Sequence, residues 1–561
     1  MQVVNAPWVT RKEVARLPRV ALLVFCALWL LPGLVGRDPW RQVEVTSYGV
    51  MLAMAQGRTS WWEPAIGGMS VDVALLPHWW GALSIHVLGD WTGPVTAVRL
   101  AYGGLLLLTM ACIWYATFHL ARTEAAQPAP MPFGGEAPAV DYARALADGA
   151  LLAYLATLGL LQLGHETTSE LLQMAAGSVF IWCVAASPWR QVTPRLALML
   201  CLPVMAGSGA PGLAVATGVA GCIICARSGY PGARKLVPWL VASLVAAAST
   251  ATALGAWRWR FGLELSWAQA WLILREWVWF LWPVWPLALW TAWRWRAQGS
   301  RRHVALPLTM AGCAVAGSVL GGGDDRVLML AVPGMAILAA FALPTFKRQG
   351  AAAIDWFSIF FFSATALFIW FMYLAMHTGW PAKPAANVAK LARGYVPEFS
   401  LIALSLALVG TLAWLALVRW RTRRQVHPLW KSMVLPAGGI VLCWMLLMTL
   451  WLPLLDYARS YRPVVVGLLP ALRTVSPQEC IAVQGASPSL VASLEVFSGL
   501  RYDARPDAGT RSECAALIQV ARGARQQLPE APPGWRLVTT VTRPTDREEK
   551  IGVYHRAAEH P

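Results

Sequence analysis

The feature that most constrains the fold is a series of apolar runs of about twenty residues each, separated by short polar segments. A helix of that length crosses the hydrocarbon core of a bilayer. Hydrophobic residues make up 57% of the chain and charged residues 13%, against about 25% charged residues in soluble proteins. The mean hydropathy is +0.50. The sequence therefore predicts an all-α polytopic membrane protein, and hydropathy gives about 13 transmembrane helices.

The positive charge of the chain is a topology signal. The formal net charge is +17, but Lys and Arg are spread in small clusters between the apolar runs, without an aromatic and basic recognition motif. We therefore expect no nucleic-acid partner. Under the positive-inside rule, the basic N-terminus and the alternate basic loops lie in the cytoplasm. The acidic loops then lie outside, and an odd number of spans puts the C-terminus outside as well.

The composition changes sharply near Asp456. Residues 1–453 are interpreted as a membrane domain. Residues 454–561 are polar, and their short apolar runs predict strands and a helix in a small α/β domain. This domain contains Cys480 and Cys514, which are expected to form a disulfide in an oxidising space outside the cell membrane. The alternative is two separate buried thiols.

The outer loop over residues 37–94 is the most informative stretch for function. Arg37, Asp38 and Glu44 fall within eight residues of one another, just beyond the first apolar run. Charged groups at the edge of a bilayer are costly unless they are used. We therefore expect the chemistry of this protein in that loop.

Several short motifs carry a resemblance to a known family. They are an Arg37-Asp38-Pro39-Trp40 loop, a Gly67-Gly68 pair before Asp72, an aromatic segment from His78 to Ser84, and the segment from Asp325 to Pro333. Together they resemble the aminoarabinose transferase and protein mannosyltransferase superfamily. Its members are glycosyltransferases like those of families 39 and 83, and they have the GT-C fold. Two departures stand out: Val43 and Val73 occupy positions where the family commonly has an aspartate and a lysine that contacts the donor phosphate.

The resemblance implies an integral-membrane enzyme that transfers a sugar, with inversion, from a polyprenyl-phosphate donor to lipid A, a glycan or a protein. It further implies a multi-pass protein of the bacterial inner membrane. Its N-terminus would be cytoplasmic and its C-terminal domain periplasmic, among membrane lipids. No cofactor is expected. Carboxylate pairs alone are weak evidence for a metal, so no metal site is expected either.

Such a transfer needs a carboxylate to take the proton of an acceptor hydroxyl. Glu44 is the first candidate, with Asp38 beside it and Asp72 orienting the substrate. The plainer alternatives are that Asp38 caps a helix and that Glu44 lies on a solvated helix face.

The phosphate leaving group calls for fixed cations, and Arg37, Arg58 and Arg326 are the candidates. Further candidates for substrate contact are Trp61, His78, His165, Glu166 and Asp325. A polar hairpin at residues 165–166 and a turn with a local ion pair at residues 325–326 are the alternatives that need no function.

Two other functions remain open on the sequence. A transporter or flippase of lipid-linked substrates is expected to show internal repeats, and we find none. A GT-C scaffold that has lost catalysis fits the departures at Val43 and Val73. One more structural expectation concerns residues 266–282, whose charged and aromatic residues predict a helix lying in the membrane interface, either lining a lateral opening for a lipid or serving as an anchor.

Overall fold

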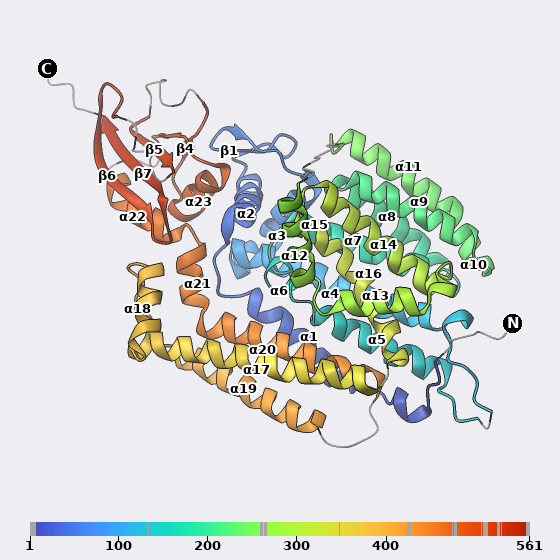
Figure 1. Cartoon of the computed structure of the whole chain (residues 1–561). Helices are drawn as coiled ribbons and strands as arrows, with labels where there is room; N and C mark the ends of the chain where they lie inside the picture. The colour runs from blue at the N-terminus through green and yellow to red at the C-terminus, as the bar shows by residue number, and fades with distance from the viewer. Residues whose placement is uncertain are drawn as a thin grey trace.

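The computed structural model is a mostly helical protein with one five-stranded sheet near its C-terminus (Figure 1). It describes residues 7–556 except for residues 133, 258–261, 263–265, 347, 423–427, 474, 476–478, 507, 509–513, 524–527 and 529. The fold class expected from the sequence, an all-α membrane body with a small α/β part at the end, is confirmed.

Within the described residues, eight helical segments are long and apolar enough to cross a membrane. They are α4 (Pro94–Ala121), α7 (Ser169–Ala186), α10 with α11 (Pro231–Ala253), α14 (Arg302–Leu320), α15 to η6 (Asp325–Thr345), most of α17 (Gly350–Thr378), α19 (Leu401–Thr422) and η7 with α20 (Leu429–Leu450). Four shorter apolar segments are α1 with η2 (Arg19–Leu34), α8 (Val192–Gly207), α9 (Pro211–Ala226) and α22 (Arg462–Leu472). The count of thirteen spans stays a prediction, because several apolar helices fall short of the length that a full crossing needs.

The helical body is built from two groups. Helices α4, α7, α8, α9, α11 and α14 pack against one another, and α5 (Ala139–Leu155) and α16 (Val332–Ala342) join them. Helices α17 (Arg348–Thr378), α19 and α20 run side by side along the lower edge of Figure 1. Small residues allow the closest approaches: a Cβ on Gly334 would lie 2.6 Å from the carbonyl oxygen of Pro307, so only glycine lets α16 meet α14 there.

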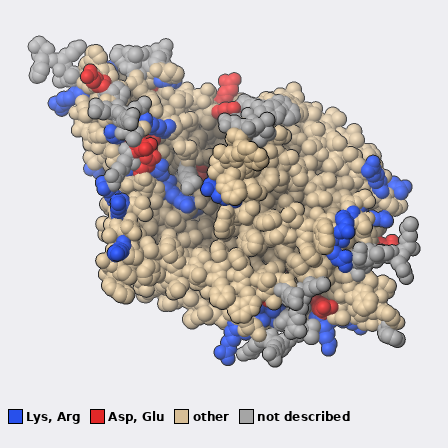
Figure 2. All heavy atoms as spheres, viewed as in Figure 1, with Lys and Arg blue, Asp and Glu red and all other residues tan. Residues whose placement is uncertain are grey.

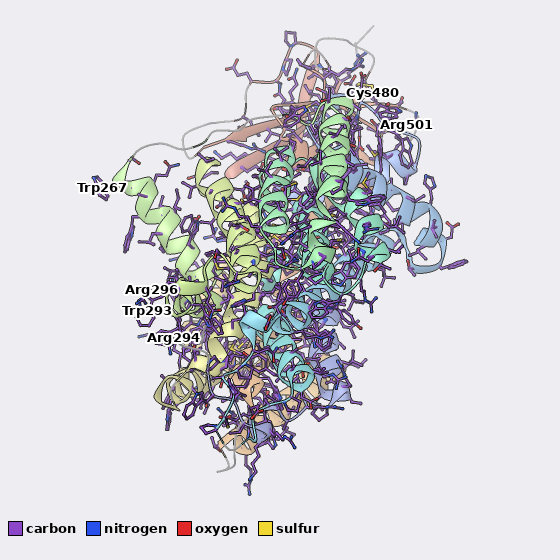
Figure 3. All side chains as sticks on the ribbon, turned by 90° about the vertical axis from the view of Figure 1, so that its right-hand side faces the viewer. Trp267, Trp293, Arg294, Arg296, Cys480 and Arg501 are labelled. Atoms are coloured by element: carbon purple, nitrogen blue, oxygen red, sulfur yellow. A yellow bond between two sulfur atoms is a disulfide. The ribbon has the colours of Figure 1, made fainter. Side chains whose placement is uncertain are left out.

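The surface agrees with a membrane environment. Figure 2 shows Lys and Arg gathered over the C-terminal domain and along the opposite edge, with a broad uncharged surface between them. The predicted helix is present as α12 (Trp267–Phe280), which meets α13 (Val284–Arg294) at a bend of 94°, and its place in the membrane interface stays a prediction. Trp267 points outward from the end of α12 in Figure 3 and is 93% exposed. An exposed indole at a helix end is typical of an interfacial anchor.

The C-terminal sheet has the strand order β4-β3-β5-β7-β6. Its strands are β3 (Ile481–Gln484), β4 (Tyr502–Asp503), β5 (Ala516–Arg522), β6 (Trp535–Arg543) and β7 (Asp546–Arg556). Strands β3, β4 and β5 are parallel, whereas β7 runs antiparallel to β5 and β6. Cys480 and Cys514 form the disulfide predicted from the sequence.

Three short helices connect this sheet to the membrane body. α21 (Leu452–Arg459) follows α20 directly, and the predicted boundary at residues 453 and 454 lies inside it. α22 continues the chain, and α23 (Pro488–Ser498) packs against α2 (Arg41–Ala55) of the outer loop. Because Gly49 has no side chain, Ala492 of α23 can lie against the backbone of α2. The C-terminal domain therefore rests directly on the loop that the sequence marks as functional.

Candidate functional site

The centre of the candidate site is a buried ion pair at the start of α2. The guanidinium of Arg37 donates to both carboxylate oxygens of Glu44, with N–O distances of 2.6 and 2.8 Å. Both side chains are 1% exposed. The backbone N–H of Trp40 also donates to Glu44, at 2.7 Å. Glu44 thus satisfies an orphan donor at the N-terminus of α2, where the helix dipole favours a negative charge.

A second arginine reinforces this arrangement from α4. Arg99 donates to the backbone carbonyls of Arg37 and Asp38 and lies 3.6 Å from the carboxylate of Glu44. Glu44 is therefore enclosed by two cations and a backbone donor. Both of its oxygens are therefore occupied by donors of the protein. The geometry suits Glu44 to positioning the loop rather than to accepting a proton.

The loop between α6 (Leu160–Leu163) and α7 joins the same cluster. Arg37 donates to the carbonyl oxygen of His165 at 2.7 Å. The imidazole of His165 lies between the rings of Trp29 and Trp444, with centroid distances of 4.6 and 4.9 Å. Burial lowers the pKa of His165 to about 4, so the ring is neutral near pH 7 and supports the loop without adding charge.

Glu166 links this loop to Arg326 at the start of α15 (Asp325–Leu328). Arg326 Nη2 lies 2.5 Å from Glu166 Oε2, and Gln162 donates to the other oxygen at 2.7 Å. Arg326 Nη1 is buried and has no hydrogen-bond partner in the part of the chain that the structure describes. An orphaned buried donor costs about 1–3 kcal/mol, and an anionic ligand would satisfy it.

The third contribution comes from the segment after α20, over α21 and the start of α22. Asp456 accepts hydrogen bonds from the indole N–H of Trp40 at 2.5 Å and from the backbone N–H of Asp38 at 3.1 Å. Arg462 holds both carboxylate oxygens of Asp38, at 2.8 and 2.6 Å. Arg459 lies over the ring of Trp40, 5.2 Å from its centroid. The C-terminal segment therefore closes over the Arg37-to-Trp40 loop.

The site thus gathers five arginines and four carboxylates into one hydrogen-bonded network. Its members are Arg37, Asp38, Trp40, Glu44, Arg99, Gln162, His165, Glu166, Arg326, Asp456, Arg459 and Arg462. On the face shown in Figure 2, the surface is hollowed between the C-terminal domain and the helical body, with basic side chains at its edge. A network with this excess of guanidinium groups is suited to an anionic ligand.

The structure brings six of the predicted residues into this network: Arg37, Asp38, Glu44, His165, Glu166 and Arg326. Asp325 is the neighbour of Arg326, and its electrostatic contact with that arginine is direct. Among the described residues, no group of three His, Cys, Asp or Glu side chains is arranged as a metal site.

Two other candidates contact different partners. Arg58 pairs with Glu495 of α23 at 2.5 Å and so ties the outer loop to the C-terminal domain. His78, in α3 (Leu75–Thr92), is 1% exposed and lies within hydrogen-bond distance of Ser47 and of the carbonyl of Ala74. Burial lowers its pKa to about 4. These contacts give both residues a role in packing.

Two further candidates lie in the same outer loop but outside the network defined above. Trp61 stacks on His86, with a centroid distance of 6.2 Å, and its carbonyl accepts a hydrogen bond from Trp79. Asp72 follows the short hairpin of β1 (Ala65–Ile66) and β2 (Met69–Ser70). A contact of either residue with substrate stays a prediction.

Five polar members of the network were not among the candidates predicted from the sequence: Arg99, Gln162, Asp456, Arg459 and Arg462. A signal existed for two of these. An arginine inside a long apolar run, as at Arg99, is costly without a partner, and Asp456 stands where the composition changes. The partners of these residues are far away in the sequence, so the pattern alone does not pair them.

The comparisons with known proteins found similarity in structure only. No family model matches the sequence, and no curated protein matches it. The structure is similar to the crystal structure of ArnT from Cupriavidus metallidurans bound to undecaprenyl phosphate, with a TM-score of 0.60 and 13% identity, covering 97% of this chain and 99% of that one. It is equally similar to ArnT of that organism in the apo state, with a TM-score of 0.59 and 14% identity over 95% and 97% of the two chains. The chain therefore has the fold of ArnT from end to end, and the GT-C, aminoarabinose-transferase-like fold predicted from the motifs is confirmed.

Proposed function

We propose that this protein is a membrane glycosyltransferase that transfers a sugar from a polyprenyl-phosphate donor to an acceptor at the periplasmic face of a bacterial inner membrane. The observation that carries the proposal is the combination of an ArnT-like fold over 97% of the chain with an arginine-rich network built on the predicted catalytic loop. One of the similar structures holds undecaprenyl phosphate, a lipid of the class that the donor requires.

Arg326 is the first candidate to hold the donor phosphate. Its Nη2 is fixed by Glu166, and its buried Nη1 lacks a partner within the described residues. A guanidinium that is held on one side and lacks a partner on the other keeps a free donor for a phosphate oxygen, which would have to displace the groups that cover this nitrogen. Its charge would also stabilise the leaving phosphate as the bond to the sugar breaks, which is worth about 3 kcal/mol.

Arg37 and Glu44 form the support of the site. The ion pair fixes the loop of residues 37–40, on which Asp38 and Trp40 face the C-terminal segment. The exposed helix α12 lies against α15 and so brings a membrane-facing surface close to Arg326. A long isoprenoid chain can lie along such a surface while its phosphate reaches the arginine.

The test is a transfer assay with purified, full-length protein in lipid nanodiscs. The donors are radiolabelled undecaprenyl-phosphate sugars of several kinds, and the acceptors are supplied as isolated cell-envelope fractions. We expect transfer from at least one donor, and we expect Arg326→Met to weaken the binding of undecaprenyl phosphate by about tenfold to a hundredfold. Arg16→Met is the matched control, because this arginine is 69% exposed and pairs only with Asp141 at 3.1 Å in the described contacts.

The outcomes separate this proposal from its alternatives. Lipid movement across the membrane without sugar transfer would favour the transporter. Binding of undecaprenyl phosphate without transfer from any donor would favour a scaffold that has lost catalysis. If Arg326→Met and Arg16→Met bind the lipid equally well, Arg326 is not the phosphate ligand.

A further inference from the structure

The four carboxylates of the network differ in which of their oxygens are occupied. Glu44 accepts from Arg37 at both oxygens and from Trp40. Asp38 is held at both oxygens by Arg462. Glu166 accepts from Gln162 at one oxygen and from Arg326 at the other. Each of these acids has both oxygens occupied by at least one donor on the protein.

Asp456 is different. Both of its hydrogen bonds, from Trp40 and from the backbone of Asp38, reach the same oxygen, Oδ1. Within the described part of the chain, Oδ2 accepts no hydrogen bond, and it is not fully buried. Two donors therefore fix the orientation of the carboxylate, while its second oxygen stays open.

We propose that Asp456 is the catalytic residue that takes the proton from the acceptor, and that the acceptor reacts through a hydroxyl group. This inference rests on the proposed function and assigns its proton acceptor. An open, oriented carboxylate oxygen is the arrangement that general base catalysis needs. A hydroxyl must lose a proton as it attacks, whereas an anionic phosphate oxygen has none to lose and would be repelled by the carboxylate.

The step balances without any further reactant. The hydroxyl oxygen of the acceptor forms a bond to the anomeric carbon of the sugar. The bond from that carbon to the phosphate oxygen breaks, and its electron pair stays on the phosphate. The hydroxyl proton passes to Oδ2 of Asp456, which later releases it to water. The products are the glycosylated acceptor and polyprenyl phosphate.

The electrostatic surroundings support this assignment. Asp456 faces Arg37 and Asp38 of the loop, Arg99 of α4 and Arg462 of α22. Burial, with a further contribution from the charge of Asp38, raises the pKa of Asp456 to about 6. A carboxylate with that pKa is a stronger base than an ordinary aspartate and is still ionised at pH 7.

A fifth acid, Glu170, differs from Asp456 in the burial of its unpaired carboxylate oxygen. It lies near Arg326, and its Oε2 also lacks a partner among the described residues, but this oxygen is buried. An acceptor hydroxyl cannot reach it without a rearrangement. The open oxygen of Asp456 is on the side of the network where the C-terminal segment meets the outer loop.

The experiment uses the transfer assay with the donor that gives the highest wild-type activity. Asp456→Asn is expected to lower kcat by about 10² to 10⁴ while leaving the KM for the donor within about twofold of wild type. Asp456→Glu, which keeps the carboxylate, is expected to recover part of the rate. Asp355→Asn is the matched control, since Asp355 is a partly buried aspartate that pairs with Arg421 at 2.6 Å, away from the network.

A pH profile separates catalysis from a structural role. Wild-type kcat is expected to fall below about pH 6, where the base becomes protonated. Trp40→Phe removes the donor that stabilises the ionised form of Asp456, so this variant is expected to shift the acidic limb to higher pH while still folding. A merely structural residue would not move this limb.

Two results would overturn the assignment while the proposed function stands. One is an active wild type whose Asp456→Asn variant keeps kcat within tenfold; the other is an acidic limb that Trp40→Phe leaves unmoved. If the wild type transfers no sugar from any donor, the proposed function fails, and the role of Asp456 fails with it. Transfer to a phosphate monoester acceptor but to no alcohol would overturn the hydroxyl assignment.

Discussion

The variant Glu44→Gln separates a structural from a catalytic role for the most buried acid of the site. Arg37 and Glu44 are each 1% exposed and share two hydrogen bonds. Removing one partner of such a pair leaves an uncompensated buried charge, which costs about 3–5 kcal/mol. Here the cost is expected at the upper end, because Arg99 lies beside the pair as a second buried cation.

The assay is thermal unfolding of the purified protein in detergent, followed by tryptophan fluorescence at matched protein and detergent concentrations. Glu44→Gln is expected to lower the Tm clearly. The double variant Arg37→Met with Glu44→Gln is expected to recover part of the loss, because neither charge is then left alone. The control is Asp141→Asn, whose ion pair with Arg16 is largely exposed and is worth about 0–1 kcal/mol.

The result that would refute the reasoning is a Glu44→Gln protein with the Tm of wild type and no transferase activity. That outcome would mean that Glu44 contributes little to the fold and acts in catalysis, as the sequence alone suggested. A double variant less stable than Glu44→Gln by the full cost of a second buried charge would also contradict the pairing.

Three further predictions concern the C-terminal segment. The pKa of Asp456 is raised from 3.8 to about 6, so its charge increasingly destabilises the folded state as the pH rises from about 4 to 6. Asp456→Asn removes this charge and is expected to raise the Tm at pH 8. In thermal scans at several pH values, the gain in Tm is expected to vanish toward pH 4. Replacing Cys480 and Cys514 by alanine opens a link between residues 34 apart and is expected to destabilise the C-terminal domain by about 2–4 kcal/mol, measured by chemical unfolding. Glu495→Gln breaks the 2.5 Å pair with Arg58 and is expected to speed limited proteolysis between the membrane body and the sheet, whereas an unchanged cleavage rate would show that apolar packing alone holds the domain.

The site combines stabilising and destabilising charges in a way that fits a functional role. Arg37 and Glu44 neutralise one another in the interior, whereas Asp456 carries a charge that its surroundings disfavour. Arg326 likewise keeps a buried donor without a partner in the described residues. Groups left in unfavourable states are common where a protein has to bind or react. Both features are expected to relax when a phosphate and an acceptor enter.

Local patterns in the sequence are enough to establish the class of the protein and the part of the chain where the site begins. Apolar runs of membrane length specify helices because an unsatisfied backbone cannot cross a bilayer. The charges at Arg37 and Glu44 are seven residues apart, and a separation this short let the loop be identified from local pattern alone. The disulfide was predictable for a similar reason, since the polar tail offered one pair of cysteines.

The groups that complete the site are brought together by the folding of distant segments. Arg37 meets His165 across 128 residues, Arg326 meets Glu166 across 160, and Trp40 meets Asp456 across 416. Periodicity and composition describe one segment at a time, so they do not encode which helix ends converge. Packing of the helices and docking of the C-terminal domain set these contacts, which bury Glu44 in an ion pair with Arg37 and leave one carboxylate oxygen of Asp456 without a hydrogen bond in the described residues.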